Sequence, residues 1–356
     1  MNDLKIVFVE INRLPRYAIE NIVRLRQLFP MIDLVLLTDS ATFHSYPRVQ
    51  EYCQIFLISA ELDQRLINLS RYQNSRDSFW IYTTQRLFAL CEYHAKNPTS
   101  SILHVESDVI LMPNFPFDKL LSIKTLLWGN YNLTHDVASL VYLPDIDSTN
   151  LLLESMKTHL KIDSSHSDMT LLRTVAEDLG ANHGYFPSLP IENSVLINSR
   201  NSWPREYIDK QYELFDIFGG IFDHQIIGMY LDGLDPHLTY GLRETLFDAT
   251  IVSGESLIDP SDISFSVNDN IELIEKDFAY PLYSIHLHSK NLELFDHTCD
   301  LLARRADAAN HNLRNLYFDV KVFWELVTSN FQKRTLCSWA KHLTRYIFSR
   351  FMKVSK

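Results

Sequence analysis

The 356-residue sequence predicts an α/β fold in which a mixed sheet is flanked by helices. Over the first third of the chain, apolar runs typical of buried strands alternate with segments of helical periodicity, which favours a parallel, doubly wound arrangement. The composition is that of a globular protein, with 46% hydrophobic and 22% charged residues. The sequence closes with a basic, aromatic-rich stretch that is expected to form a helical extension.

Four short apolar runs in the first part of the chain are expected to form buried strands. A helix over residues 17–29 has apolar side chains at helical spacing and stops before Pro30. A second helix is expected to begin at Asp77 or Ser78, either of which can cap it, and to end near Ala95. The four strands are expected at residues 4–11, 34–37, 54–59 and 101–106.

The pattern changes after Pro116, where longer loops separate the apolar segments. One helix is expected at residues 167–179, together with strands at residues 125–128, 139–143, 194–198 and 282–287. We therefore predict one α/β domain over residues 1–300, with halves at about 1–116 and 117–300, followed by a helical extension over residues 301–356.

The net charge of −11 conceals two regions of opposite sign. The first 300 residues carry 22 basic and 41 acidic side chains, so this body is a poor candidate for nucleic-acid binding. Residues 333–356 carry seven basic side chains and no acidic one. This segment either makes a peripheral contact with an anionic membrane or packs against the domain with a solvated basic face.

The N-terminus and the cysteines indicate a soluble, cytoplasmic protein. The first apolar run is too short for a signal peptide, and the sequence has no run of 18 apolar residues that could span a membrane. Four cysteines lack metal-ligand or disulfide spacing, which fits a reducing compartment: Cys53, Cys91, Cys299 and Cys337.

Two carboxylates mark the end of the fourth expected strand. Glu106 and Asp108 follow an apolar run and precede another, so a buried strand presents a Glu-x-Asp pair at the edge of the sheet. Ligands of open α/β sheets bind outside the carboxyl ends of the strands. Paired carboxylates at that edge suit Mg²⁺ or Mn²⁺ carrying substrate phosphates.

Three further clusters contain side chains suited to the same chemistry, and each also has a structural interpretation. Arg86, in the aromatic-rich helix before the Glu-x-Asp strand, could bind a diphosphate or pair with a carboxylate. Asp223 lies between Gly219-Gly220 and an apolar helix, where it could act in catalysis or only cap the helix. His286 and His288 share one face of the last strand, as metal ligands or as structural histidines.

The order of these motifs resembles the GT-A-fold nucleotide-sugar glycosyltransferases over roughly residues 4–295. It is similar to bacterial sugar transferases with a modified DxD motif and to glycogenin-like galactosyl- and glucosyltransferases. The resemblance depends on Thr38-Asp39, Arg86, Glu106-Ser107-Asp108, Phe222-Asp223-His224-Gln225 and His286-Leu287-His288-Ser289-Lys290. It implies a GT-A-like sheet with a nucleotide-binding half and an acceptor half.

The resemblance also implies a set of metal ligands. In that superfamily the last carboxylate of the DxD motif binds a divalent metal directly, which corresponds to Asp108, and Glu106 would contact the ribose or the metal. A C-terminal histidine often completes the site. His286 matches that position if Ser289 replaces the usual glycine, and His288 is the alternative.

The remaining site residues follow from the same comparison. Asp223 and Gln225 correspond to an element that lines the donor and acceptor sugars. Arg86 and Lys290 would neutralise the leaving diphosphate. An inverting enzyme would need a carboxylate base, with Asp223 as first candidate and Asp168 as second, whereas a retaining enzyme would not.

The sequence thus predicts a metal-dependent glycosyltransferase that uses Mn²⁺ or Mg²⁺ and a nucleotide sugar, with a UDP-sugar expected by resemblance. The expected acceptor is a glycan or a lipid-linked saccharide, as in polysaccharide biosynthesis. Glu10 and Asp39, at the exits of the first two strands, are expected near the nucleobase. The alternatives are a sugar-phosphate nucleotidyltransferase and a non-catalytic binding protein on a glycosyltransferase-like fold.

Overall fold

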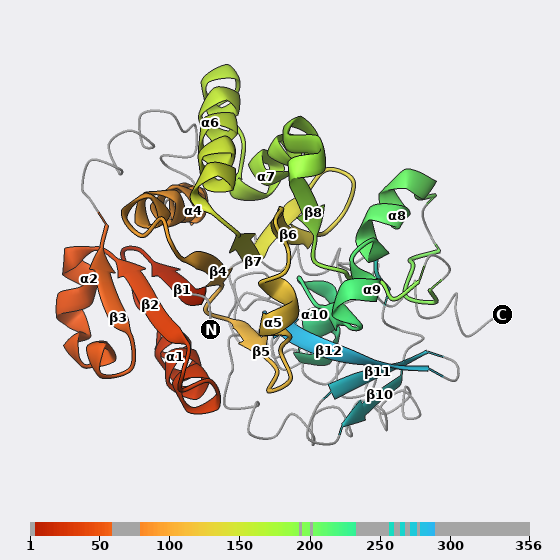
Figure 1. Cartoon of the computed structure of the whole chain (residues 1–356), viewed down its shortest axis with the longest axis horizontal. Coiled ribbons are helices and arrows are strands. Elements are labelled where there is room, and N and C mark those ends of the chain that lie inside the picture. Colours follow the sequence, from red (N-terminus) through yellow and green to blue (C-terminus); the bar gives the residue numbers. More distant parts are fainter. Residues whose placement is uncertain are drawn as a thin grey trace, which may run out of the picture.

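A seven-stranded mixed sheet organises the protein (Figure 1). The computed structural model describes residues 4–58, 79–191, 194–199, 202–232, 256–259, 264–267, 271–275 and 278–288. In spatial order the strands of this main sheet are β3 (Gln54–Leu57), β2 (Asp33–Thr38), β1 (Leu4–Glu10), β4 (Ser101–Val105), β7 (Asp136–Leu143), β6 (Leu126–Asn130) and β8 (His183–Tyr185).

The strands β3, β2, β1 and β4 are parallel, as the alternation of strand and helix patterns predicts. Beyond them β7 runs antiparallel to β4, and β6 runs antiparallel to β7. The predicted α/β class with a mixed sheet flanked by helices is therefore confirmed.

A second, smaller sheet lies beside the main one and pairs segments that are far apart in the sequence (Figure 1). The short strand β5, which follows the Glu-x-Asp motif, runs antiparallel to β12 near the end of the described chain. The strands of this sheet are β10 (Ser264–Val267), β11 (Ile271–Glu275), β12 (Phe278–His286) and β5 (Val109–Leu111), with β9 (Ile221–Phe222) parallel to β12.

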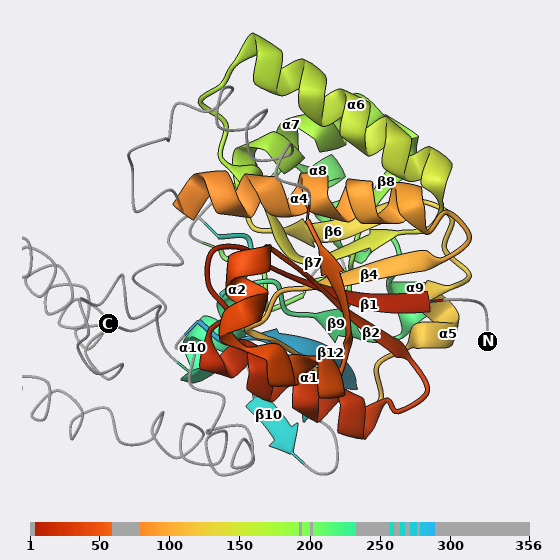
Figure 2. The same ribbon diagram turned by 90° about the vertical axis from the view of Figure 1, so that its left-hand side faces the viewer.

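Helices cover both faces of the main sheet (Figure 2). The long helices are α1 (Arg16–Leu28), α4 (Phe79–Lys96), α6 (Ile146–Ile162) and α7 (Asp168–Leu179). The shorter ones are α2 (Ser40–Ser45), α5 (Phe117–Leu120), α8 (Arg205–Tyr212), α9 (Phe215–Phe218) and α10 (Ile226–Asp232), with 3-10 turns at Pro47–Glu51 and Gly180–Asn182.

The alternation of side chains along β1 explains this layering. Leu4, Ile6 and Phe8 belong to the core that α1 covers. Val7 and Val9 point to the opposite face, into the core formed with α4, α6 and α7. A strand that is apolar on both faces must be covered on both, which is the property of a central strand in an α/β sheet.

In the second half of the chain one predicted strand is wrong and one helix is missing from the prediction. Residues 194–198 do not form a strand, because Ser194 to Leu196 turn and only Ile197 makes an isolated bridge, to Ile258. The helix α6 was not predicted, although Asp145 caps it by accepting from the Ser148 N–H at 2.8 Å. Its buried face includes polar side chains, so the apolar spacing is diluted there: Thr149, Leu152, Ser155, Met156 and Leu160.

Several predicted features lie outside the described residues. These are the helix cap at Asp77 or Ser78, Lys290, and the basic extension over residues 301–356 with its proposed membrane segment. Among the described residues, no helix is long and apolar enough to cross a bilayer.

Candidate functional site

The carboxyl ends of β4 and β12 bring together the acidic motif and the C-terminal histidine. Glu106 and Asp108 lie in the turn between β4 and β5, and His286 is the last residue of β12. The antiparallel pairing of β5 with β12 sets Val109 opposite His286, so the histidine lies beside the acidic turn. One ligand atom from each of Glu106, Asp108 and His286 lies within 4.8 Å of the others.

The imidazole of His286 has its orientation fixed by a backbone carbonyl. Its Nδ1 lies 2.7 Å from the His224 oxygen, so Nδ1 carries the proton and donates it. Its Nε2 then offers a lone pair, 3.3 Å from Asp108 Oδ2 and 3.5 Å from Glu106 Oε2. This is the arrangement that orients a metal-binding histidine.

Arg86 forms an ionic group with Glu106 and with two further acidic residues, Asp168 and Glu10. The Arg86 guanidinium on α4 pairs with the Glu106 carboxylate. Burial acts to lower the pKa of Arg86, but Glu106, Asp168 and Glu10 together raise it above its usual range. Burial acts to raise the pKa of Glu106, whereas the Arg86 guanidinium brings it below its usual range.

Asp168, the first residue of α7, is almost fully buried near Arg86. Burial raises its pKa to about 6, against the opposing effect of the guanidinium. One of its carboxylate oxygens, Oδ1, has no hydrogen-bond partner among the described residues.

Glu10 closes the group from the end of β1. Its carboxyl accepts a hydrogen bond from the Ser107 hydroxyl, in the middle of the acidic turn. Burial raises the pKa of Glu10 to about 7, and the nearby charges of Asp108 and Glu106 add to that shift. The Arg86 guanidinium thus interacts with three carboxyl groups, and Asp108 adds a fourth acidic side chain beside them. This excess of acidic groups favours a cation.

The raised pKa of Glu10 predicts a pH-dependent cost to stability in metal-free protein. A carboxyl whose pKa is about 7 when folded and about 4.5 when unfolded destabilises the fold as the pH rises through that interval. The Glu10→Gln variant should therefore gain stability relative to the wild type between pH 4.5 and 7, by about 2 kcal/mol. Urea unfolding in the presence of a chelator, repeated across this pH range, measures the difference.

An exposed glutamate provides the control for this experiment. Glu213 follows α8 at the surface, and Glu213→Gln makes the same chemical change at an exposed position. A stability difference between Glu10→Gln and wild type that stays constant from pH 4.5 to 7 would contradict the prediction.

Both carboxylate oxygens of Asp223 accept hydrogen bonds from backbone N–H groups. Its Oδ1 accepts from the N–H groups of Gln225 and Ile227, each at 3.0 Å. Its Oδ2 accepts from the N–H groups of Gly228 at 2.7 Å and His286 at 3.0 Å. The carboxylate therefore joins the start of α10 to the end of β12, which agrees with the helix-cap interpretation.

The other predicted residues lie around this centre. Asp39 caps α2 and accepts from the Asn12 N–H at 2.7 Å, so it fixes the turn after β1. Gln225 is partly buried at the start of α10. The ring of His288 lies against that of His286, tilted by 33° with 4.1 Å between the ring centroids, and it is His286 that supplies the imidazole of the cluster.

Sequence reasoning missed two residues that hold the acidic turn. Ser107 is the middle residue of the motif, and its hydroxyl donates a hydrogen bond to the Glu10 carboxyl. Asn21, buried on α1, donates to the Ser107 oxygen at 3.1 Å and to the Val109 oxygen at 2.7 Å. A polar residue on the apolar face of a predicted helix was the available signal for Asn21.

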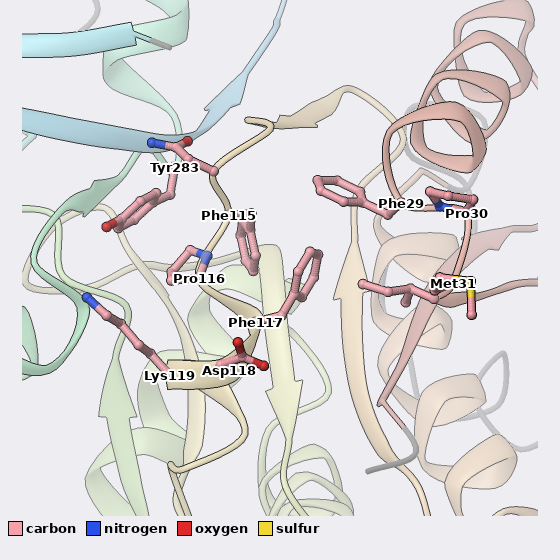
Figure 3. A pocket seen from close by; sticks show the side chains of 11 residues that line it. Phe29, Pro30, Met31, Phe115, Pro116, Phe117, Asp118, Lys119 and Tyr283 are labelled. Atoms are coloured by element: carbon pink, nitrogen blue, oxygen red, sulfur yellow. The ribbon is translucent and has the colours of Figure 1, made fainter. Parts of the chain in front are cut away.

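A separate apolar pocket of about 470 Å³ lies at the other end of the main sheet (Figure 3). It is lined by Phe29 and Pro30 after α1 and by Phe115, Phe117 and Tyr283. The segment after α1 leads into the start of β2, so this pocket lies at the amino end of that strand. None of the predicted site residues lines it.

The chain is similar to known proteins in structure and not in sequence. No protein-family model matches the sequence, and no curated protein sequence is significantly similar to it. The PaToxG glycosyltransferase is similar over 50% of this chain and 70% of its own, with 9% identity and a TM-score of 0.34. The galactosyltransferase LgtC, in complex with donor and acceptor sugar analogues, is similar over 51% and 73%, with 13% identity and a TM-score of 0.37. The glycosyltransferase GlyE of Streptococcus pneumoniae is similar over 52% and 45%, with 11% identity and a TM-score of 0.32.

Proposed function

We propose that this protein is a metal-dependent glycosyltransferase that moves a sugar from a nucleotide diphosphate sugar to a saccharide acceptor. The observation that carries the proposal is the convergence of Glu106, Asp108 and His286 at the carboxyl ends of the strands. This is the edge at which open α/β sheets bind ligands. A UDP-sugar donor and a glycan or lipid-linked acceptor are the specific forms that we propose.

The residues present fit a divalent cation. Two carboxylate oxygens and an imidazole nitrogen are ligands that suit Mn²⁺, and Mg²⁺ when water and phosphate complete its shell. The Nδ1 of His286 is held by the His224 carbonyl, so its Nε2 is already oriented toward the carboxylates. When bound, the cation would act as a Lewis acid on the leaving diphosphate.

The chain's own charges would position the donor around that cation. Arg86, held near Glu106 and Asp168, presents a fixed positive charge for a phosphate oxygen. Lys290 would add a second. Glu10 and Asp39, at the ends of β1 and β2, would contact the nucleoside, and Gln225 the sugar.

The two proposed bases receive different roles from their contacts. Each oxygen of Asp223 already accepts two backbone N–H groups, so we assign this residue to positioning His286 and the start of α10. Asp168 is buried beside Arg86, and we assign it to holding the guanidinium.

The test is a thermal-shift comparison of nucleoside diphosphates with and without Mn²⁺. Ligand that binds only the folded state stabilises it by about 2.7 kcal/mol at 100 times its Kd. We expect UDP with Mn²⁺ to raise the Tm by several degrees, and UDP with a chelator to raise it much less. GDP and CDP under the same conditions report the choice of base.

Turnover separates the proposal from its alternatives. Release of UDP from a UDP-sugar, with Mn²⁺ and without acceptor, would exclude a purely binding function. Pyrophosphate release from a nucleoside triphosphate and a sugar phosphate would indicate a nucleotidyltransferase instead. Equal thermal shifts with Mn²⁺ and with chelator would contradict the metal-dependent site.

A further inference from the structure

Asn21 is a fully buried polar side chain on the helix that packs beneath the acidic turn. Its neighbours on the same face of α1 are apolar: Ala18, Ile22 and Leu25. Asparagine has a lower helix propensity than alanine or leucine, and burying its amide costs free energy unless hydrogen bonds compensate. Neither helix formation nor core packing therefore explains an asparagine at this position.

The amide of Asn21 binds the backbone on both sides of Asp108. Its Nδ2 donates to the carbonyl oxygen of Ser107 at 3.1 Å and to that of Val109 at 2.7 Å. These residues precede and follow Asp108 directly in the sequence. One NH₂ group has two hydrogens, and both are used on the two peptide groups next to the proposed metal ligand.

Other contacts hold the same turn at different points. The Val109 N–H donates to the backbone carbonyl of Glu106 at 2.9 Å, and the Leu287 N–H donates to the backbone carbonyl of Asp108 at 2.8 Å. The turn is therefore tied to β12 through Asp108 and to α1 through the residues around it. Without the Asn21 amide, the carbonyls of Ser107 and Val109 would lose their hydrogen bonds to α1.

We propose that Asn21 is a positioning residue that fixes the direction of the Asp108 carboxylate and so sets the affinity of the site for a divalent cation. This inference rests on the proposed function, since it takes Asp108 as a ligand. The amide must be a donor, because a carboxylate at this place would face two carbonyl oxygens. The mechanism is that of a partner outside the ligand set that orients a ligand.

The experiment measures the Kd for Mn²⁺ from the electron paramagnetic resonance signal of free Mn²⁺, in the full chain without nucleotide. Asn21→Ala removes both donors and is expected to weaken binding by about 10-fold or more. Asn21→Ser, which keeps a short polar side chain, serves as a second variant. Circular dichroism confirms that each variant is folded at the temperature of the measurement.

Arg24 supplies the matched control, one helical turn further along α1. Its guanidinium donates to the Leu111 carbonyl at 3.0 Å, so it also ties α1 to β5, but away from Asp108. Arg24→Met should lower the Tm and leave the Kd for Mn²⁺ unchanged. If Arg24→Met weakens Mn²⁺ binding as much as Asn21→Ala does, the role of Asn21 is general packing and the inference is overturned.

The remaining outcomes distinguish a failure of the inference about Asn21 from a failure of the proposed function. Folded Asn21 variants that bind Mn²⁺ with the wild-type Kd overturn the inference, and so does failure of both variants to fold. If the wild type binds Mn²⁺ and Asp108→Asn does not, the metal site stands whatever Asn21 does. If the wild type does not bind Mn²⁺, the proposed function itself fails.

Discussion

Asp108→Asn is expected to abolish Mn²⁺-dependent binding of UDP and to lower kcat/KM for a UDP-sugar by about three orders of magnitude. The substitution keeps the shape of the side chain and removes its charge. Asp108 Oδ2 lies 3.3 Å from His286 Nε2, so the variant would lose a carboxylate from the centre of the cluster. Isothermal titration with UDP and Mn²⁺, followed by a UDP-release assay, measures both effects.

An aspartate far from the cluster provides the control. Asp118 is exposed on α5, beside the apolar pocket, and Asp118→Asn should leave binding and turnover unchanged. Wild-type affinity for UDP with Mn²⁺ in the Asp108→Asn variant would remove Asp108 from the metal site.

Gly228→Ala is expected to destabilise the protein by about 3 kcal/mol and to weaken the site at the same time. A methyl group at Gly228 would overlap the carbonyl of His286 and lie 2.9 Å from Asp223 Oδ2. In an exposed helix the same change would stabilise by about 1 kcal/mol, so the sign of the effect reports this close approach. Urea unfolding gives the free energy, and Mn²⁺ titration gives the affinity.

Gly184→Ala is the matched glycine control. A Cβ there would lie 3.2 Å from Leu127 Cδ2, the end of a side chain that can move. Its destabilisation should be smaller, and its Mn²⁺ affinity should equal that of the wild type. A Gly228→Ala variant as stable as the wild type would mean that α10 can move away from β12 without cost.

The sequence predicts the clustered charged residues of this site better than the contacts that hold them in place. Glu106, Asp108 and Arg86 belong to strong local patterns, namely an apolar strand that ends in acids and a helix with a buried cation. His286 ends an apolar strand and was predicted with His288 as alternative. The resemblance to GT-A enzymes placed these residues in one group, and their geometry brings them together.

The supporting contacts are not visible in local patterns. Asn21 lies 86 and 88 positions away from the carbonyls that it binds, and nothing in the periodicity of residues 17–29 indicates that pairing. The strand predicted at residues 194–198 is wrong because a short apolar run does not distinguish a strand from a buried turn. Residue propensity and apolar spacing predict which segments form helices and strands, whereas the positions of polar side chains depend on the whole fold.

The pairing of β5 with β12 also affects the order in which the protein is completed. During synthesis the strands β1, β2, β3 and β4 are made early, and the acidic turn emerges with them. His286 follows much later in the sequence, at the end of β12, and contacts of such large sequence separation form slowly. A nascent chain can therefore build the parallel part of its main sheet before the cluster of Glu106, Asp108 and His286 exists, because that cluster forms only once β12 has been made and has paired with β5.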